Sequence, residues 1–90
     1  MVDRADRLAP PPFWRTRYFA QEAMQRPDRR EIDLGDVKRA LAEPGRKERQ
    51  PDGRWRHWLW VVERGRWLRV IVEPDGETIH NVFWDRNFKP

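Results

Sequence analysis

The second half of the chain contains three runs rich in Trp, Val and Ile that are separated by turn-forming residues. The runs cover residues 55–63, 67–73 and 77–84, and the breaks are Arg64-Gly65 and Pro74-Asp75-Gly76. Aromatic and β-branched residues favour strands, and short breaks that contain glycine favour hairpin turns. The pattern therefore predicts a three-stranded antiparallel β-meander.

The first half of the chain predicts two helices. One covers residues 13–24, where apolar side chains recur at helical spacing, and ends before Pro27. Its apolar positions are Trp14, Tyr18, Phe19 and Ala23. The second begins after a cap at either Asp33 or Asp36 and ends near Glu43. Its apolar stripe consists of Leu34, Val37, Ala40 and Leu41.

The order of these elements predicts the fold class. Ninety residues fit one small domain. We expect an α+β two-layer sandwich over residues 13–90, with two N-terminal helices packed on the three-stranded antiparallel meander. Residues 1–12 contain three consecutive prolines and no apolar periodicity, so they are expected to form a flexible Pro-rich arm.

Composition excludes several functional classes. The chain has no cysteine and no serine, which excludes disulfides, thiolate metal sites and serine nucleophiles. No nucleotide-binding loop or metal-ligand spacing is present, so we expect neither a cofactor nor a metal. No run approaches the roughly 20 apolar residues of a membrane span, and the start lacks an apolar leader. These features predict a cytoplasmic protein that does not bind membranes.

The pairing of the last two strands allows two registers. In the favoured one Ile79 pairs with Val72 and Phe83 with Leu68. The core face then contains Leu59, Val61, Leu68, Val70, Val72, Ile79 and Phe83. The reverse face contains Trp58, Trp60, Trp67 and Trp84 among Arg56, Arg69, Ile71, His80 and Val82. In the alternative, a bulge slips the last strand by one residue and moves His80 to the core side.

Several short motifs resemble domain-of-unknown-function family 4258. The family reads His-apolar-x-x-x-x-Met, then Arg-x-Ile, x-x-Val-x-x-x-Leu and Pro, followed by strands with a Leu-Arg-Val-Val-like centre. The matching segments are residues 18–24, 29–32, 36–37, 40–41, 44, 68–72 and 78–82. The family's early His falls on Tyr18 here, which puts any activity of that His in doubt.

This resemblance implies a fold and a class of function. The family is similar to the RelE and BrnT toxins, which are small basic α+β proteins, many of which cut RNA and pair with an antitoxin. The implied fold is a RelE-like two-layer sandwich. The implied partners are RNA and an antitoxin-like protein.

Candidate site residues follow from the chemistry of metal-independent RNA cleavage. It needs a proton-exchanging group and cations around the phosphate. In the favoured register His80, Arg69 and Arg56 lie on one face and are the candidate catalytic residues. Residues that could bind RNA or form an interface are Arg54, Trp58, Trp60, Trp67, Trp84 and Arg86.

The same residues have alternative interpretations. His80 and Arg69 could be solvated, or paired with Glu73, Glu77 or Asp85. Alternating strand tryptophans often pack in a core or a dimer interface. The chain could therefore be a non-catalytic interaction module whose Trp-rich face binds a second copy or a partner protein. A ligand-binding or structural domain is the third hypothesis.

Overall fold

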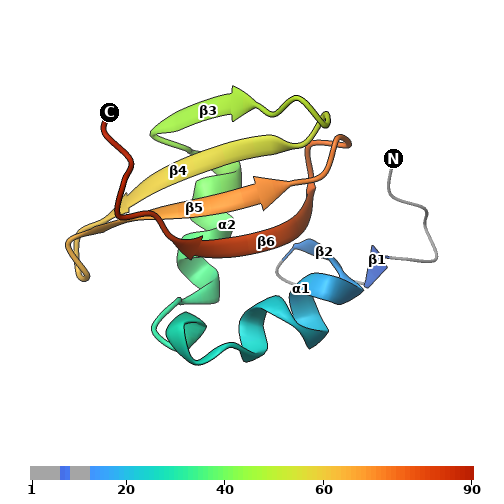
Figure 1. Cartoon of the computed structure of the whole chain (residues 1–90), viewed down its shortest axis with the longest axis horizontal. Coiled ribbons are helices and arrows are strands. Elements are labelled where there is room, and N and C mark those ends of the chain that lie inside the picture. The colour runs from blue at the N-terminus through green and yellow to red at the C-terminus, as the bar shows by residue number, and fades with distance from the viewer. Residues whose placement is uncertain (1–6, 9–12) are drawn as a thin grey trace.

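The computed structural model describes residues 7–8 and 13–90 (Figure 1). The strands are β1 (Arg7–Leu8), β2 (Trp14–Thr16), β3 (Arg46–Arg49), β4 (Trp55–Val61), β5 (Arg66–Val72) and β6 (Thr78–Trp84). The helical segments are α1 (Arg17–Gln21), η2 (Ala23–Gln25), η3 (Pro27–Arg29) and α2 (Leu34–Ala42). Within the described residues, no helix is both long enough and apolar enough to cross a membrane.

The sheet corrects the predicted fold class. We expected a three-stranded antiparallel meander, but the strands form a six-stranded mixed sheet in the order β1-β2-β6-β5-β4-β3. The meander β4-β5-β6 is present only as its central part. β2 runs parallel to β6, with Trp14 opposite Thr78 and Arg15 opposite Ile79. The fold remains α+β, but the three-stranded sandwich is wrong.

None of the predicted strands covers β3. Its four residues, Arg-Lys-Glu-Arg, are all charged and mostly exposed, so they contain no apolar alternation. It pairs antiparallel with β4 and forms one edge of the sheet (Figure 1). Charged side chains on an edge strand discourage pairing with another chain. The absence of an apolar pattern is therefore compatible with an edge strand.

The helical part also differs from the prediction. The expected helix over residues 13–24 is replaced by β2, the short helix α1 and the 3-10 turn η2. α1 begins after Thr16, whose Oγ1 accepts a hydrogen bond from the Phe19 backbone N–H at 3.1 Å. α2 begins after Asp33, whose carboxylate accepts from the Gly35 N–H at 2.6 Å. Asp36 instead pairs with Arg39 on the helix surface.

The predicted arm at residues 1–12 lies largely outside the described residues. Within that range the structure places the backbone of Arg7–Leu8 in β1, antiparallel to β2.

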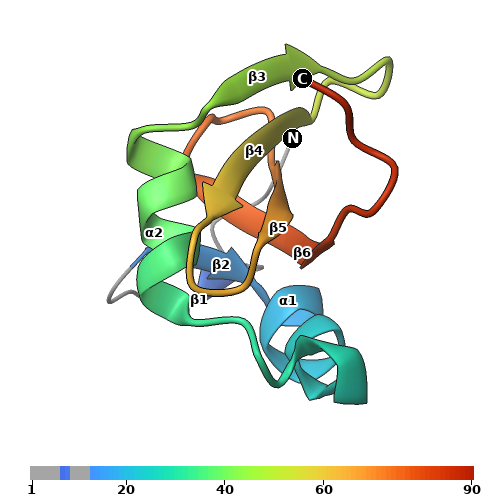
Figure 2. The same cartoon turned by 90° about the vertical axis from the view of Figure 1, so that its left-hand side faces the viewer.

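The core lies between the sheet and the helices. α2 packs against one face of the sheet, and the residues after β6 pass over the opposite face (Figure 2). The buried apolar cluster consists of Phe13, Phe19, Ala23, Ile32, Val37, Ala40, Leu59, Val61, Leu68, Val70, Val72, Ile79 and Val82. The face away from α2 is the reverse face of the sheet.

A β-bulge sets the register of β6. Val72 pairs with Ile79, but the next residue of β5, Ile71, pairs with Asn81. His80 is therefore an extra residue in β6. A bulge of this kind reverses the alternation of all later side chains.

The bulge moves the side chains after His80, including those of Val82 and Phe83, to the opposite faces from those expected. Val82 is fully buried in the core. Phe83 pairs with Arg69, and the Arg69 guanidinium carbon lies 5.2 Å from the centre of its ring. The favoured register is therefore wrong after Ile79. The alternative is right about the bulge and the slip of one residue, but His80 does not join Val70 and Val72: it is half-buried and contacts Glu73 and Tyr18.

Candidate functional site

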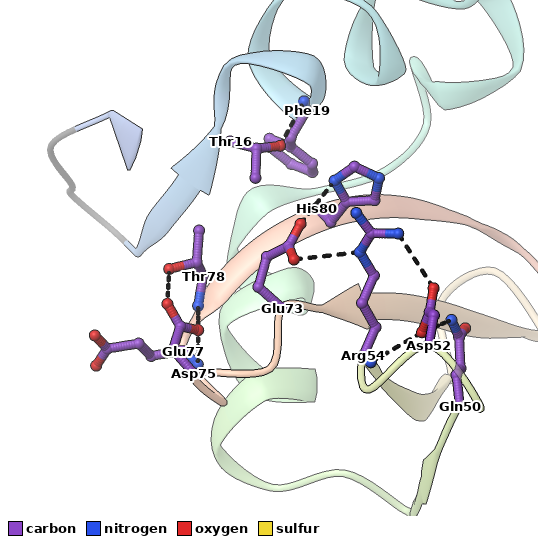
Figure 3. Close-up of polar contacts among 10 residues, drawn as sticks. All are labelled: Thr16, Phe19, Gln50, Asp52, Arg54, Glu73, Asp75, Glu77, Thr78 and His80. Carbon is purple, nitrogen blue, oxygen red and sulfur yellow. Dashed lines mark hydrogen bonds and ion pairs between the residues drawn. The ribbon is translucent and has the colours of Figure 1, made fainter. Parts of the chain in front are cut away.

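His80 belongs to a small polar cluster at the end of the β5–β6 hairpin (Figure 3). Its Nδ1 lies 3.0 Å from one carboxylate oxygen of Glu73, a side chain that is only 6% exposed. The other oxygen accepts a hydrogen bond from Arg54 Nε at 3.2 Å. The imidazole also stacks on Tyr18, with ring centres 4.9 Å apart. The alternative in which His80 pairs with Glu73 is therefore confirmed.

The surroundings of His80 favour its neutral form. Burial lowers its pKa below the usual value, and the positive charge of Arg54 lowers it further, while Glu73 and Asp52 act in the opposite direction. A neutral imidazole can accept a proton near pH 7. The surrounding partners, however, are side chains of the protein itself.

His57 is a second histidine with a lowered pKa. It is 2% exposed on the core face, and its Nδ1 lies 2.9 Å from the Ala40 carbonyl oxygen. Burial is the main cause of the lowered pKa; the Ala40 carbonyl opposes it and the Lys47 charge adds to it. His57 is therefore a structural residue of the core.

Both lowered pKa values predict that the protein loses stability on acidification. In the unfolded chain the histidines titrate near pH 6.5, so just below that pH the unfolded state binds more protons than the folded state. The free energy of unfolding should therefore fall as the pH drops through this window. Urea denaturation at about pH 7.5 and about pH 5.5 measures the change. His80→Gln should reduce the loss, and a wild-type protein equally stable at both pH values would contradict this expectation.

The two candidate catalytic arginines lie apart from this cluster. Arg69 Nη1 lies 3.5 Å from Asp85 Oδ2, which confirms the alternative in which Arg69 pairs with Asp85. Arg56 Nε donates to Gln50 Oε1 at 3.3 Å. Both arginines line one open pocket, whereas His80 does not line it. The structure thus brings Arg56 and Arg69 together and places His80 with Glu73.

Trp58 is a packing residue rather than an exposed stacking platform. It is 4% exposed, and its Nε1 donates to Asp85 Oδ2 at 2.9 Å. Phe88 stacks on its ring at 4.5 Å and makes an edge contact with Trp67 at 4.8 Å. The segment after β6 therefore covers part of the reverse face. Neither Asp85 nor Phe88 was among the predicted site residues, because no local pattern marks a return of the chain over the sheet.

The remaining predicted tryptophans meet in one pocket, which we call the Trp–Arg groove. It has a volume of about 300 Å³ and is lined by Trp60, Gly65, Arg66, Trp67, Trp84, Asp85 and Arg86. Trp60 is 43% exposed, and its ring lies edge-on to Trp67 at 5.5 Å. The Arg66 guanidinium lies 5.6 Å from the centre of the Trp84 ring. The groove therefore combines exposed indole surface with two cations.

Two other predicted residues differ from the expectation. Trp84 packs against the core cluster instead of lying wholly on the reverse face, because the bulge at His80 shifts the end of β6. Arg54 lies outside the groove, where it pairs with Glu73 and Asp52. Arg66 was missed by sequence reasoning, although it precedes a predicted tryptophan directly.

The groove continues into a second hollow of about 510 Å³. The two share Arg66, Trp84 and Arg86, and the second adds Arg30 and Glu31 from the turn after η3. Arg66 pairs with Glu31 across this hollow at 3.5 Å. Three arginines thus surround an open surface next to the indole rings.

No family model matches this sequence, and neither a curated protein nor a solved structure was found to be similar to it. Among residues 7–8 and 13–90, no three acidic or histidine side chains gather as a metal site. We therefore infer the function from the geometry of the groove and its surroundings.

Proposed function

We propose that this protein binds single-stranded RNA through the Trp–Arg groove. The observation that supports the proposal is the shared lining of one pocket by three tryptophans and two arginines. Unpaired bases stack on aromatic rings, and guanidinium groups bind phosphate oxygens through paired hydrogen bonds. A surface with both groups side by side suits a single strand, whose bases are not paired with a partner strand and can stack on the rings.

The proposed activity is binding rather than cleavage. The only acidic side chain that lines the groove is Asp85, which already accepts from Trp58 and pairs with Arg69. His80 lies in a different cluster, where Glu73 and Tyr18 contact its ring. General acid–base catalysis needs a proton-exchanging group within hydrogen-bond reach of the reacting atom. The side chains that line the groove do not include a proton-exchanging group that is free of other partners.

Trp60→Ala tests the proposal with a matched control. Trp60 and Leu34 are both 43% exposed, but Leu34 is at the start of α2, outside the groove. Loss of one stacked base costs about 1–3 kcal/mol, so the substitution should weaken RNA binding roughly 5- to 150-fold. Fluorescence anisotropy with a labelled single-stranded RNA of about ten nucleotides measures the affinity. Leu34→Ala should bind like the wild type.

Salt and strand dependence complete the test. Because arginines replace counterions on the phosphates, affinity should fall as salt rises. A duplex of the same sequence should bind more weakly, since its bases are already stacked. Equal affinity of the wild type and Trp60→Ala for the single strand would overturn the proposal.

A protein partner is a second candidate function. Val62, which follows β4 and lies two residues from Trp60, is 73% exposed. Large exposed apolar side chains close together are typical of protein interfaces. Val62→Ser should weaken self-association or partner binding, measured by sedimentation velocity, and should leave RNA affinity unchanged.

A further inference from the structure

The pocket lined by Arg56 and Arg69 lies on the reverse face of the sheet, next to the Trp–Arg groove, with which it shares Asp85. It has a volume of about 390 Å³ and its charged lining residues come from β3, β4, β5 and the C-terminal segment. They are Arg46, Arg56, Arg69 and Lys89, together with Glu48 and Asp85. Four cationic and two anionic side chains leave an excess of two positive charges around the pocket.

The two carboxylates of the pocket are already engaged. Glu48 pairs with Arg46 at 2.8 Å. Asp85 Oδ2 accepts from Trp58 at 2.9 Å and lies 3.5 Å from Arg69, which is long for a hydrogen bond. Arg56 donates to the neutral amide oxygen of Gln50. The charge of Arg56 is therefore not balanced by this contact.

Arg69 is held in place with an unsatisfied donor. Its guanidinium carbon lies 5.5 Å from the centre of the Trp58 ring and 5.2 Å from that of Phe83. Its Nε is buried and has no hydrogen-bond partner in the structure. Because Nε is enclosed by protein atoms, the terminal nitrogens are the donors that Arg69 can offer to a ligand in the pocket. The rings of Trp58 and Phe83 flank the guanidinium and restrict its position.

We propose that this pocket binds a phosphate group, with Arg69 and Arg56 as its principal donors. A phosphate has up to two negative charges and several acceptor oxygens, which match the excess positive charge and the guanidinium donors of the pocket. The phosphate could belong to a nucleotide or be free in solution, because the recognising chemistry is the same. The proposal does not depend on RNA binding at the Trp–Arg groove.

NMR spectroscopy of the full-length ¹⁵N-labelled protein tests the site. Inorganic phosphate and adenosine 5′-monophosphate are titrated separately while the arginine Nε–H signals are followed. Each is compared with sodium chloride at the same ionic strength. The Arg69 and Arg56 signals should shift and saturate with phosphate but not with chloride. Similar affinities for both ligands would support a site for the phosphate alone, and tighter binding of the nucleotide would support a nucleotide site.

Arg56→Gln is the test variant, and Arg39→Gln is its control. Arg39 lies on α2, which packs on the opposite face of the sheet, and its substitution changes the net charge equally. Loss of a charged hydrogen bond should weaken phosphate binding about tenfold or more in Arg56→Gln, while Arg39→Gln binds normally. Shifts that follow ionic strength alone, or equal weakening in both variants, would overturn the proposal. Failure of RNA binding with intact phosphate binding would overturn only the proposed function.

Discussion

Val82→Asp is expected to abolish folding, whereas Asn81→Asp should leave the protein folded. Val82 is fully buried among the core residues, so an aspartate there would place an unpaired carboxylate away from water. The cost of several kcal/mol is comparable to the whole stability of a small domain, about 5–15 kcal/mol. Far-ultraviolet circular dichroism and urea denaturation measure the effect.

Asn81→Asp is a matched control because it introduces the same residue one position earlier in the chain. Asn81 pairs with Ile71 away from the core face, and its Oδ1 accepts from the Val82 backbone N–H at 2.9 Å. Aspartate keeps that oxygen. If β6 had the continuous register favoured from the sequence, the tolerance of the two positions would be reversed. A folded Val82→Asp protein would therefore argue against the bulge at His80.

Local sequence patterns predicted the strands in which apolar residues alternate and the helix that has a capping residue. β4, β5 and β6 lie within or close to the predicted runs, because an apolar face repeats every second residue. The predicted turns contain Gly65 and Gly76, both with positive φ, which glycine adopts without strain. α2 begins and ends near the predicted positions because Asp33 caps it and Pro44-Gly45 follow it.

Pairing between distant segments could not be predicted. β2 has three residues and lies between β1, with which it pairs antiparallel, and β6, with which it pairs in parallel. β3 is charged throughout, so no apolar alternation marks it as a strand. It pairs with β4 through its backbone, and Lys47 and Arg49 lie over the Trp55 ring. The bulge at His80 depends on packing between whole strands, and a shift of one residue exchanged Val82 and Phe83 between the two faces.

The candidate site was predicted only in part, because it too depends on contacts between distant segments. Trp60, Trp67 and Arg86 were selected by residue type, and the structure brings them together in the groove. Two of the candidate catalytic residues, Arg56 and Arg69, share a pocket, but His80 has separate partners. Residue type thus indicates what a side chain can bind, while the tertiary fold decides which side chains share a site.

The C-terminal segment divides the reverse face into two sites. Asp85 lines both the Trp–Arg groove and the pocket of Arg56 and Arg69 that we propose binds phosphate. Phe88 lies against Trp58 and Trp67. A bare tryptophan face would favour association with another protein. Here the chain covers part of that face with its own residues, and the surface that stays open is flanked by arginines. This arrangement favours a polar, anionic ligand over an extended apolar partner.

Removal of residues 85–90 is expected to destabilise the protein by about 3–5 kcal/mol and to cause self-association. The Trp58 N–H would exchange its hydrogen bond to Asp85 for one to water, which costs about 0.5–1.5 kcal/mol, and the Phe88 ring contacts would add to the loss. The backbone bond from the Asp85 N–H to the Trp67 carbonyl, 2.9 Å long, would also be lost. Urea denaturation and sedimentation velocity measure the two effects.

A shorter deletion of Lys89 and Pro90 is the control. Both residues are exposed, and their removal leaves Asp85 and Phe88 in place, so stability should change by less than about 0.5 kcal/mol. The longer deletion exposes Trp58 and Trp67 together, which creates the apolar patch that drives association. If the protein without residues 85–90 were as stable and as monodisperse as the full chain, the segment would not protect the tryptophan face. The reverse face would then be available to a partner protein, and the interaction module would become the better explanation of its tryptophans.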